Sequence, residues 1–500
     1  MSWTMSMAIL QWSNRSSHFL YIRSSMSFKC HALGGYALSL LKNRLLYTRR
    51  ELRMSRSGAE RLNMVQLAIF SSPVLVFQAL ELPWRVFLPV FFSETLGLQL
   101  AAVAALMMWI RLFDMVVDPV VGWASDRFAT PIGLRRPWMV ASVPLILLGT
   151  WQTFFAAPGI GLWTLALWCL AMHLGYTLLL VPHGGWGLEV SGDYHERTRI
   201  MGAKVWFAAA GMPFVLLLPT ILEYFGRDGR AGQVAAMGWM LILITPLSVA
   251  LVLRYIPEPP VDRDAARRTA HPLRQFRTML RDRTLLTILM LYALLGLADA
   301  ASAGTFIFFV EQGLALGRGA SGLMLIQALV ALVSIPVWAA VSRRFGKRRA
   351  LAGVFAWHAA LSPVALLLPA GEMVPLVLFL IVRNFSWGAD YMLLRALVAD
   401  VSGRDAEVSG ERKSGSYYAM FNVTLKLAAA LGVGAALSVL AWKGFVPGSP
   451  ATGAVVTAIR WVYALPPCLA GLLGLVILMR ATPETAVPAA TPVAPREAIS

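Results

Sequence analysis

Long apolar runs alternate with short polar connections along most of the 500-residue chain. Each run is long enough to cross about 30 Å of hydrocarbon as an α-helix, and none shows the alternation over about ten residues that membrane β-strands require. The pattern therefore predicts an all-α membrane protein. Its twelve transmembrane helices are expected at 64–92, 99–124, 138–157, 162–185, 203–222, 236–256, 284–311, 319–341, 350–369, 374–399, 416–441 and 456–480.

Composition agrees with this pattern, because 58% of the residues are hydrophobic and only 14% are charged, whereas soluble chains carry about 25% charged residues. The net charge of +18 does not indicate a nucleic-acid partner, because of where the basic residues lie. The N-terminal segment and alternate connections hold 31 Lys and Arg, and the opposite connections hold 4. This asymmetry predicts that both termini face the cytoplasm, in a multi-pass protein of the cytoplasmic (inner) membrane.

The polar segment 257–283 divides the predicted spans into six and six. Similar connections follow the second and eighth spans: DPVVGWASDRFATPIGLRRPWM and IPVWAAVSRRFGKRRAL each place Pro and Trp before an Arg-rich turn. Two related six-helix bundles with a cytoplasmic central loop form the layout of the major facilitator fold, in which substrate sites lie between the halves. The bundles are expected at 64–256 and 284–480.

The two ends of the chain differ from the rest. Residues 1–63 hold ten Lys or Arg and no apolar run of 18 residues. We expect a poorly ordered cytoplasmic extension, translated upstream of a true start at Met54 or Met64. An amphipathic segment on the membrane surface is the alternative. Residues 481–500 are rich in Pro and Ala and are expected to be disordered.

Charged residues interrupt the second span, where residues 111–126 read RLFDMVVDPVVGWASD. Arg111, Asp114 and Asp118 are spaced i, i+3, i+7, which places them on one helix face. Each charge costs about 2.5–3.5 kcal/mol at the centre of a span, so this face is expected to point into the protein. Two acids four residues apart are suited to bind a cation or share a proton; a static Arg111–Asp114 ion pair is the structural alternative.

Lys426 lies in the middle of the eleventh span, in MFNVTLKLAAALG. A lysine at that depth either reaches the membrane surface or pairs with an acid. We predict that it pairs with Asp114 and Asp118 across the two halves.

Together these motifs resemble those of the glycoside–pentoside–hexuronide:cation symporters, the melibiose-permease branch of the major facilitator superfamily. The resemblance covers about 64–480. Besides the second-span motif with its downstream GLRRPW, it includes YTLLLVPHGGWGLEVSGDYHERTRIMGAKVWF after the fourth span and ERKSGSYYAMFNVTLKLAAALG through the eleventh.

The resemblance implies roles for individual residues. Asp114 and Asp118, with Thr177, would bind the coupling Na⁺ or H⁺, and Lys426 would link the cation and sugar sites. Arg111, on the acidic face of the same span, is assigned to coupling with Lys426. The gating residues are expected to be Arg135, Arg136, Glu189 and Arg197.

The chain also departs from the family pattern. Val117 stands where melibiose-type members have an Asn, which removes an oxygen ligand and leaves both Na⁺ and H⁺ open. The sugar-binding acids of the first and fourth spans align with Gln78 and Leu180, and the fifth-span Arg aligns with Lys204. The sugar identity is therefore not carried over.

Other polar residues in the spans are candidates to bind the solute. Glu81 lies one turn from Gln78 and can replace the missing acid in part, although it can also simply pair with Arg85. The candidate substrate-binding residues are Gln78, Glu81, Tyr176, Lys204, Asp299, Trp387, Asp390 and Tyr391.

The sequence thus predicts a cation-coupled symporter of a sugar or glycoside-like solute that works by alternating access and functions as a monomer in the lipid bilayer. Transport of an amphipathic solute such as a lysophospholipid is the alternative. A receptor or scaffold explains the buried acids poorly. We expect no enzyme activity, no nucleic-acid partner, no cofactor and no metal beyond a possible Na⁺.

Overall fold

The computed structural model describes residues 61–224, 229–258, 272–316, 320–445 and 453–480. These residues are helical apart from their connections and one isolated β-bridge between Thr130 and Gly133. The predictions for residues 1–60 and 481–500, and for the part of the central loop at 259–271, lie outside the described residues.

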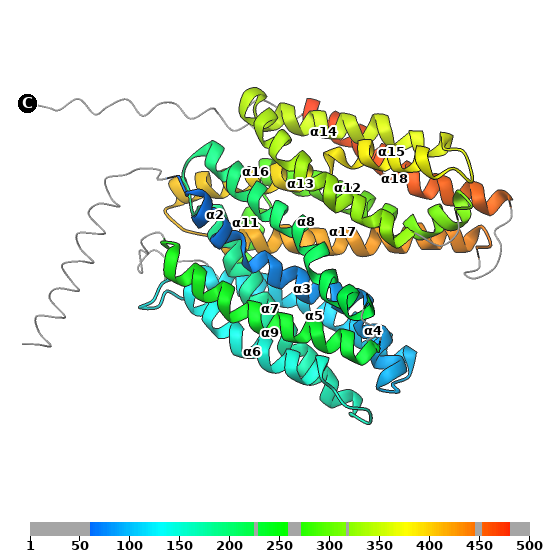
Figure 1. Ribbon diagram of the computed structural model, residues 1–500. Coiled ribbons are helices and arrows are strands. Elements are labelled where there is room, and N and C mark those ends of the chain that lie inside the picture. The colour runs from blue at the N-terminus through cyan, green and yellow to red at the C-terminus, as the bar shows by residue number, and fades with distance from the viewer. Residues whose placement is uncertain (1–60, 225–228, 259–271, 317–319, 446–452, 481–500) are drawn as a thin grey trace, which may run out of the picture. The chain divides into compact units, whose positions relative to one another are not determined.

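The helices follow the apolar runs, and each of the twelve predicted ranges contains at least one (Figure 1). Ten helical segments in the described part are long and apolar enough to cross a membrane. The first half contains α2 Met64–Ser71, α3 Pro73–Val86, α4 Leu88–Val90, α5 Leu100–Arg127, α6 Arg136–Phe154, α7 Leu162–Glu189, α8 Tyr194–Tyr224 and α9 Arg230–Tyr255. The second half contains α11 Pro272–Met279, α12 Arg283–Phe308, α13 Ala320–Phe345, α14 Lys347–Leu361, α15 Met373–Arg383, α16 Ala389–Ser409, α17 Ser414–Trp442 and α18 Gly453–Arg480.

The tenth predicted range, 374–399, is not one helix. α15 ends at Arg383, a 3₁₀ turn covers Asn384–Ser386, and α16 begins at Ala389. Gly388 between them has φ +84°, and a Cβ there would lie 3.2 Å from side-chain atoms of Ile335. Because both the left-handed backbone and the close contact favour glycine, this residue fixes the break. The hydropathy pattern alone does not reveal it.

Several helices extend beyond the apolar runs that predicted them. α7 continues to Glu189, α8 begins at Tyr194, and α16 continues to Ser409. The length of an apolar run reflects the thickness of the hydrocarbon core. The helix itself can continue beyond that core, into the polar region at the membrane surface. The central loop also contains the short helix α11, which the sequence analysis did not anticipate.

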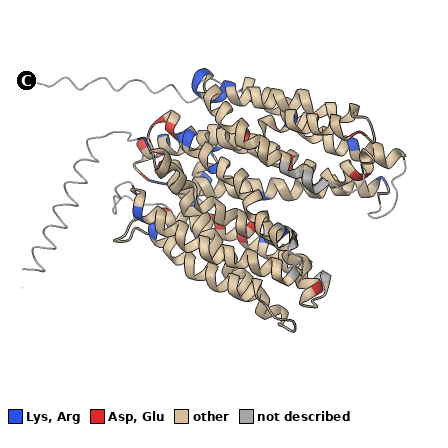
Figure 2. Ribbon diagram, in the orientation of Figure 1, with Lys and Arg blue, Asp and Glu red and all other residues tan. Residues whose placement is uncertain are grey.

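We call the ends of the helices at 127–136, 189–194, 255–283, 345–347 and 409–414 the Arg-rich end. Figure 2 shows Lys and Arg gathered there and sparse along the helices between the ends.

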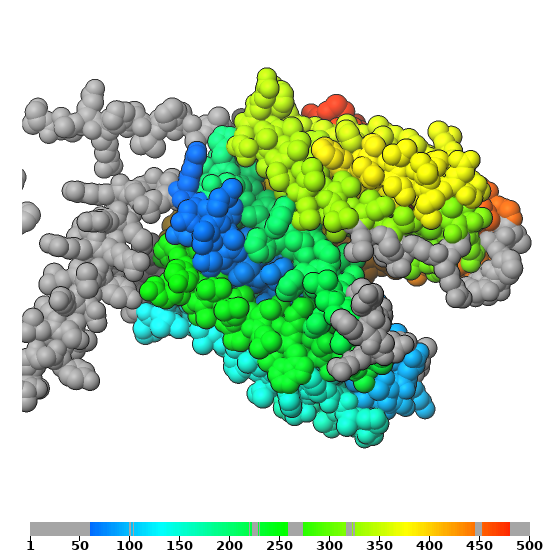
Figure 3. Space-filling model, in the orientation of Figure 1, coloured from blue at the N-terminus to red at the C-terminus, as the bar shows by residue number. Residues whose placement is uncertain are grey.

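Helices from the two halves pack directly against each other. α5 and α7 contact α17, while α8 contacts α13 and α16. Figure 3 shows the contact of α8, in blue-green, with α13, in yellow-green. The halves therefore meet along two seams, and charged residues in these seams face other helices.

Glycines let some helices approach closely, as is common within membranes. At Gly149 in α6, an added Cβ would lie 2.6 Å from the Met172 Cβ and 2.7 Å from its backbone nitrogen in α7. At Gly434 in α17, an added Cβ would have nothing within 4 Å.

We predict that Gly149→Ala destabilises the protein by about 1–3 kcal/mol, because the methyl group forces α6 and α7 apart. The matched variant Gly434→Ala should leave stability unchanged or raise it slightly. The midpoint of thermal unfolding of the purified protein in detergent measures both. Equal midpoints for the two variants would contradict the proposed packing.

Candidate functional site

The acid pair of the second span lies inside the protein. Asp114 and Asp118 are 1% and 0% exposed in α5, whose acidic face is turned toward α7 and α17. Lys426 of α17 reaches the pair, as the sequence predicts: its Nζ is 2.8 Å from Asp118 Oδ2 and 3.6 Å from Asp114 Oδ2. These three charged groups therefore join the two halves at mid-span.

Asp118 is well supplied with hydrogen-bond donors. The Thr177 hydroxyl donates to its Oδ1 at 3.1 Å, and the Asn422 amide donates to its Oδ2 at 2.6 Å, in addition to Lys426. Sequence reasoning singled out Thr177 but missed Asn422. A polar residue four positions before Lys426 lies on the same helix face, and this spacing is the signal that could have identified it.

Asp114 contrasts with Asp118, because neither of its carboxylate oxygens has a hydrogen-bond partner among the described residues. A buried ionised group without donors is costly. The two carboxylates and the Lys426 ammonium leave one net negative charge, which a single monovalent cation would neutralise. The described residues contain no group of three His, Cys, Asp or Glu suited to a metal ion.

Arg111 does not pair with Asp114, the arrangement considered above as a structural alternative. Its Nη2 lies 2.5 Å from Oε1 of Glu81 in α3. Arg85 also binds this oxygen, with its Nε donating at 2.7 Å. The expected Glu81–Arg85 pair is thus present, but Glu81 is shared between two arginines.

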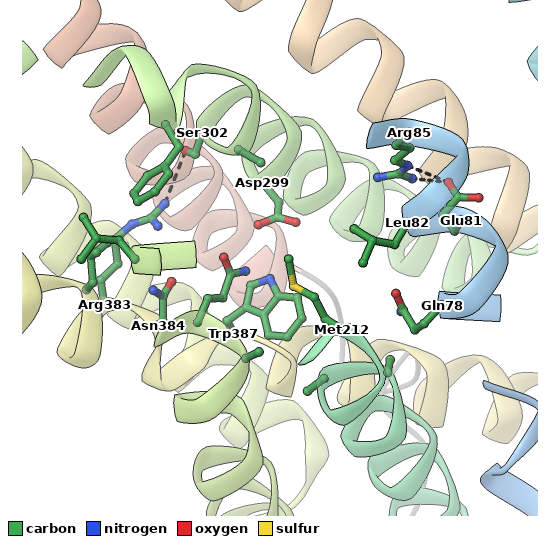
Figure 4. A pocket seen from close by; sticks show the side chains of 18 of the residues that line it. Gln78, Glu81, Leu82, Arg85, Met212, Asp299, Ser302, Arg383, Asn384 and Trp387 are labelled. Atoms are coloured by element: carbon green, nitrogen blue, oxygen red, sulfur yellow. Dashed lines mark hydrogen bonds and ion pairs between the residues drawn. The ribbon is translucent and has the colours of Figure 1, made fainter. Parts of the chain in front are cut away.

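A cavity of about 300 Å³ lies between the two halves, at the lower end of the sizes usual for small-molecule sites. In Figure 4, Gln78, Glu81 and Arg85 face Asp299, Asn384 and Trp387 from opposite halves. The lining residues are Gln78, Glu81, Leu82, Arg85, Ala208, Ala209, Met212, Asp299, Ser302, Ala303, Phe306, Leu323, Gln327, Ala328, Leu380, Arg383, Asn384, Trp387 and Tyr463.

Four of the eight candidate substrate residues line this cavity: Gln78, Glu81, Asp299 and Trp387. The other four, Tyr176, Lys204, Asp390 and Tyr391, are not among its lining residues.

Tyr391 and Asp390 lie next to the lining. The Tyr391 hydroxyl donates to Asp299 Oδ2 at 3.0 Å, and Asp390 Oδ2 is 3.4 Å from His358 Nε2. Sequence reasoning missed Arg383, whose guanidinium lies near the Ser302 and Tyr463 hydroxyls at 3.4 Å. The break in the tenth span brings it into the lining.

Lys204 is buried away from the cavity. Its Nζ is 3.4 Å from His183 Nδ1 and lies over the rings of Phe70 and Tyr418 at 5.6 and 5.5 Å. Tyr176 is also buried, and its ring packs edge-on against Phe77. Both side chains therefore pack in the helix core.

At the Arg-rich end, Arg135 forms a latch between the halves. This fully buried guanidinium donates to Asp126 at 2.6 Å, Glu189 at 2.9 Å and Ser414 at 2.7 Å. Asp126 in turn accepts the backbone N–H groups of Gly415 and Ser416, both at 2.8 Å. The end of α5 and the connection between α5 and α6 thus bind the start of α17. We call this set the Arg135 latch.

A second latch lies on the other seam. Asp400 of α16 binds Arg197 of α8 at 3.1 Å and Lys347 of α14 at 2.7 Å. The Lys347 ammonium also lies 3.6 Å from the centre of the Tyr194 ring in α8. Arg197 was expected among the gating residues, and its acidic partner Asp400 comes from the opposite half.

Arg136 has a different role from its neighbour. Its Nη2 donates to the Ile256 carbonyl at 3.0 Å, and its Nε lies 3.7 Å from Glu258 Oε2. Burial raises the pKa of the Glu258 carboxyl above its ordinary value, against the opposing effect of hydrogen bonds from the Arg135 and Leu134 N–H groups. Arg136 therefore contacts the segment after α9, within its own half.

A helical membrane protein with a central cavity and ion-paired seams is a secondary transporter in architecture. The chain belongs to the MFS/sugar transport protein family, whose model matches residues 69–483. The resemblance to the glycoside–pentoside–hexuronide:cation symporters is confirmed.

Individual relatives differ in the solutes that their names give. A glucuronide carrier protein homolog of Escherichia coli is 25% identical, with 78% of this chain and 86% of the relative covered. A sodium-dependent lysophosphatidylcholine symporter of Danio rerio is 21% identical over 72% of this chain and 75% of its own. Among solved structures, the major facilitator transporter FucP in the outward conformation has a TM-score of 0.61 at 13% identity, covering 84% of this chain and 99% of that chain. This likeness shows the fold.

We predict that Arg135→Lys lowers the free energy of unfolding by about 3 kcal/mol. Lysine keeps the charge but lacks the planar fork that serves four partners, and disturbing a buried ion pair is costly. Hydrogen exchange of the Gly415 and Ser416 amides should also accelerate, because Asp126 loses its fixed position. Mass spectrometry of the purified protein measures this exchange.

Arg136→Lys is the matched control, since Arg136 is partly exposed and its hydrogen-bond and ion-pair partners lie in the segment after α9. It should leave both amides protected. Equal exchange in the two variants would show that the Arg135 latch does not hold α17.

Proposed function

We propose that this protein is a cation-coupled symporter that moves a small polar, sugar-like solute by alternating access. The observation that carries the proposal is Asp114, a buried carboxylate beside Asp118 and Lys426 whose two oxygens have no hydrogen-bond partner among the described residues. If Asp114 served only in a structural ion pair, its carboxylate oxygens would be expected to accept hydrogen bonds. We assign Asp114, Asp118 and Thr177 to a monovalent cation, Na⁺ or H⁺, and Lys426 and Arg111 to coupling. No other cofactor is proposed.

The proposed topology has twelve spans, with α5 and α6 crossing the membrane in addition to the ten segments of sufficient length and hydropathy. The Arg-rich end faces the cytoplasm, as expected from the excess of Lys and Arg, in the inner membrane. We propose that each chain works as a monomer.

The cavity and the latches support the alternating-access part of the proposal. The lining residues on α3 and α12 lie in the later parts of these helices, away from the Arg-rich end. The Arg135 latch and the Asp400 latch join the halves at the Arg-rich end. We propose that this arrangement is the outward-facing state, and that Arg135, Glu189 and Arg197 act as the gate while Arg136 anchors the segment after α9.

Polar groups converging from both halves favour a sugar-like solute. Gln78, Asp299 and Asn384 offer hydrogen-bond donors and acceptors, and Trp387 offers an aromatic face beside them. We propose that the lining residues contact the solute. Tyr391 supports Asp299 through its hydrogen bond to Oδ2. Lys204 and Tyr176 would approach the solute only after the halves rearrange.

The alternative is transport of a lysophospholipid-like solute. It is favoured by one observation, the relative of Danio rerio that is named for such a solute. The charged groups at both walls of the cavity argue against an acyl chain as its occupant, because burying them against hydrocarbon is unfavourable.

The decisive experiment reconstitutes the purified protein in proteoliposomes and measures uptake of radiolabelled monosaccharides, glycosides, uronides and lysophosphatidylcholine under imposed Na⁺ or pH gradients. Concentrative uptake of a sugar or glycoside under one gradient supports the proposal. Gradient-driven uptake of lysophosphatidylcholine alone supports the alternative. If neither gradient drives any solute, the symport assignment is wrong.

We predict that Asp118→Asn and Lys426→Ala each reduce gradient-driven uptake about 100-fold or more, because breaking a buried ion pair costs about 3–5 kcal/mol. Asp405→Asn is the control. Asp405 pairs with Lys413 at 3.3 Å at the Arg-rich end, and its variant should transport at the wild-type rate. Wild-type uptake by Lys426→Ala would remove this residue from the mechanism.

A further inference from the structure

One guanidinium lies within reach of two acids that belong to different sites. Arg111 binds Glu81, which lines the cavity. Asp114 follows Arg111 by three positions in α5, a spacing at which helical side chains meet, and both of its oxygens lack hydrogen-bond partners. In this structure Arg111 is bound to Glu81, and Asp114 is left without a hydrogen bond among the described residues.

From this geometry we propose that Arg111 is a two-position coupling residue, which moves between Glu81 at the cavity and Asp114 at the cation site. The inference rests on the proposed function and deepens it. It gives the physical means by which the cation and the solute influence each other's binding.

The direction of coupling follows from electrostatics. A cation on Asp114 repels the guanidinium and keeps it on Glu81. Without a cation, the buried Asp114 carboxylate attracts Arg111, because an unpaired buried charge is costly. Cation binding thus completes the Glu81–Arg111 group at the cavity wall.

The solute acts in the opposite direction through the same residue. A solute hydroxyl that hydrogen-bonds to Glu81 and Arg111 favours the position of Arg111 at the cavity. Asp114 then stays available, so the cation binds more tightly. Any coupled pair of sites must be reciprocal in this way. Here each ligand strengthens the binding of the other, as symport requires.

Other charged groups near Arg111 do not replace it in this role. Arg85 shares Glu81 Oε1, but its side chain is 61% exposed and it follows Glu81 by one turn in α3. Lys426 lies 3.6 Å from Asp114, yet its closer partner is Asp118 at 2.8 Å. Among the described residues, Arg111 is the group that has a cavity residue for its partner and lies one turn from the acid pair.

The test measures cation binding in the absence of solute. Radioactive Na⁺ binding to the purified protein in detergent is measured at several pH values, with proton uptake followed by a pH indicator in the same preparations. Glu81→Gln should weaken cation binding on the order of tenfold, within the usual range of couplings between sites. The released Arg111 then competes for Asp114, although Glu81 itself does not touch the cation.

The double variant gives the sharpest outcome. Glu81→Gln combined with Arg111→Gln should restore cation binding to near the wild-type value, since the competing guanidinium is gone. Glu81→Gln combined with Arg85→Gln is the matched control and should remain weak. Arg111→Gln alone should bind the cation at least as tightly as the wild type, and this variant tests the proposal even if Glu81→Gln does not fold.

Each result decides the inference. Unchanged binding in Glu81→Gln, no recovery in the Arg111 double variant, or equal recovery in the Arg85 double variant would overturn it while leaving the cation site in place. If the wild-type protein binds neither Na⁺ nor a proton at Asp114 and Asp118, the proposed function fails as well. Thermal unfolding midpoints of all variants show that each is folded.

Discussion

The ion pairing of α5 with α17 is the constraint on which the rest of the structure depends. Two carboxylates and one ammonium lie where hydrocarbon would exclude them, and they are tolerated because they face each other across the two halves. Thr177 and Asn422 add donors from α7 and α17 to Asp118. Since these partners come from both halves, any movement of one half against the other changes the electrostatic environment of the acids.

Charge also fixes the Arg-rich end, but by a different arrangement. In the Arg135 latch and at Asp400, the carboxylates are supplied with hydrogen-bond donors. For Asp126 these donors include the backbone N–H groups at the start of α17. The acid pair at mid-span is incompletely satisfied by comparison. Fully satisfied networks stabilise one arrangement, whereas an unsatisfied one leaves binding energy available to a ligand. The structure thus separates groups that hold the halves together from groups that respond to what is bound.

Much of the fold follows from the sequence, because apolar length and the distribution of Lys and Arg report directly on the bilayer. The sequence also predicts that Asp114 and Asp118 share one helix face and that Lys426 lies in the middle of its span. The cavity was less so. Arg383 enters its lining through the break at Gly388, and Asn422 was hidden by its apolar surroundings. Lys204 and Asp390 carry polar groups at plausible depths, but which neighbours they meet depends on helix rotation, which hydropathy does not determine.

The break at Gly388 has a consequence for how such a chain can diversify. The piece before it and the turn itself carry Arg383, Asn384 and Trp387 at the cavity, while the piece after it carries Asp400 at the latch. Because the break at Gly388 separates the two pieces, a substitution at the cavity need not disturb the register of the segment that carries Asp400. Under the proposed function, specificity and closure would then depend on separate parts of a single crossing of the bilayer.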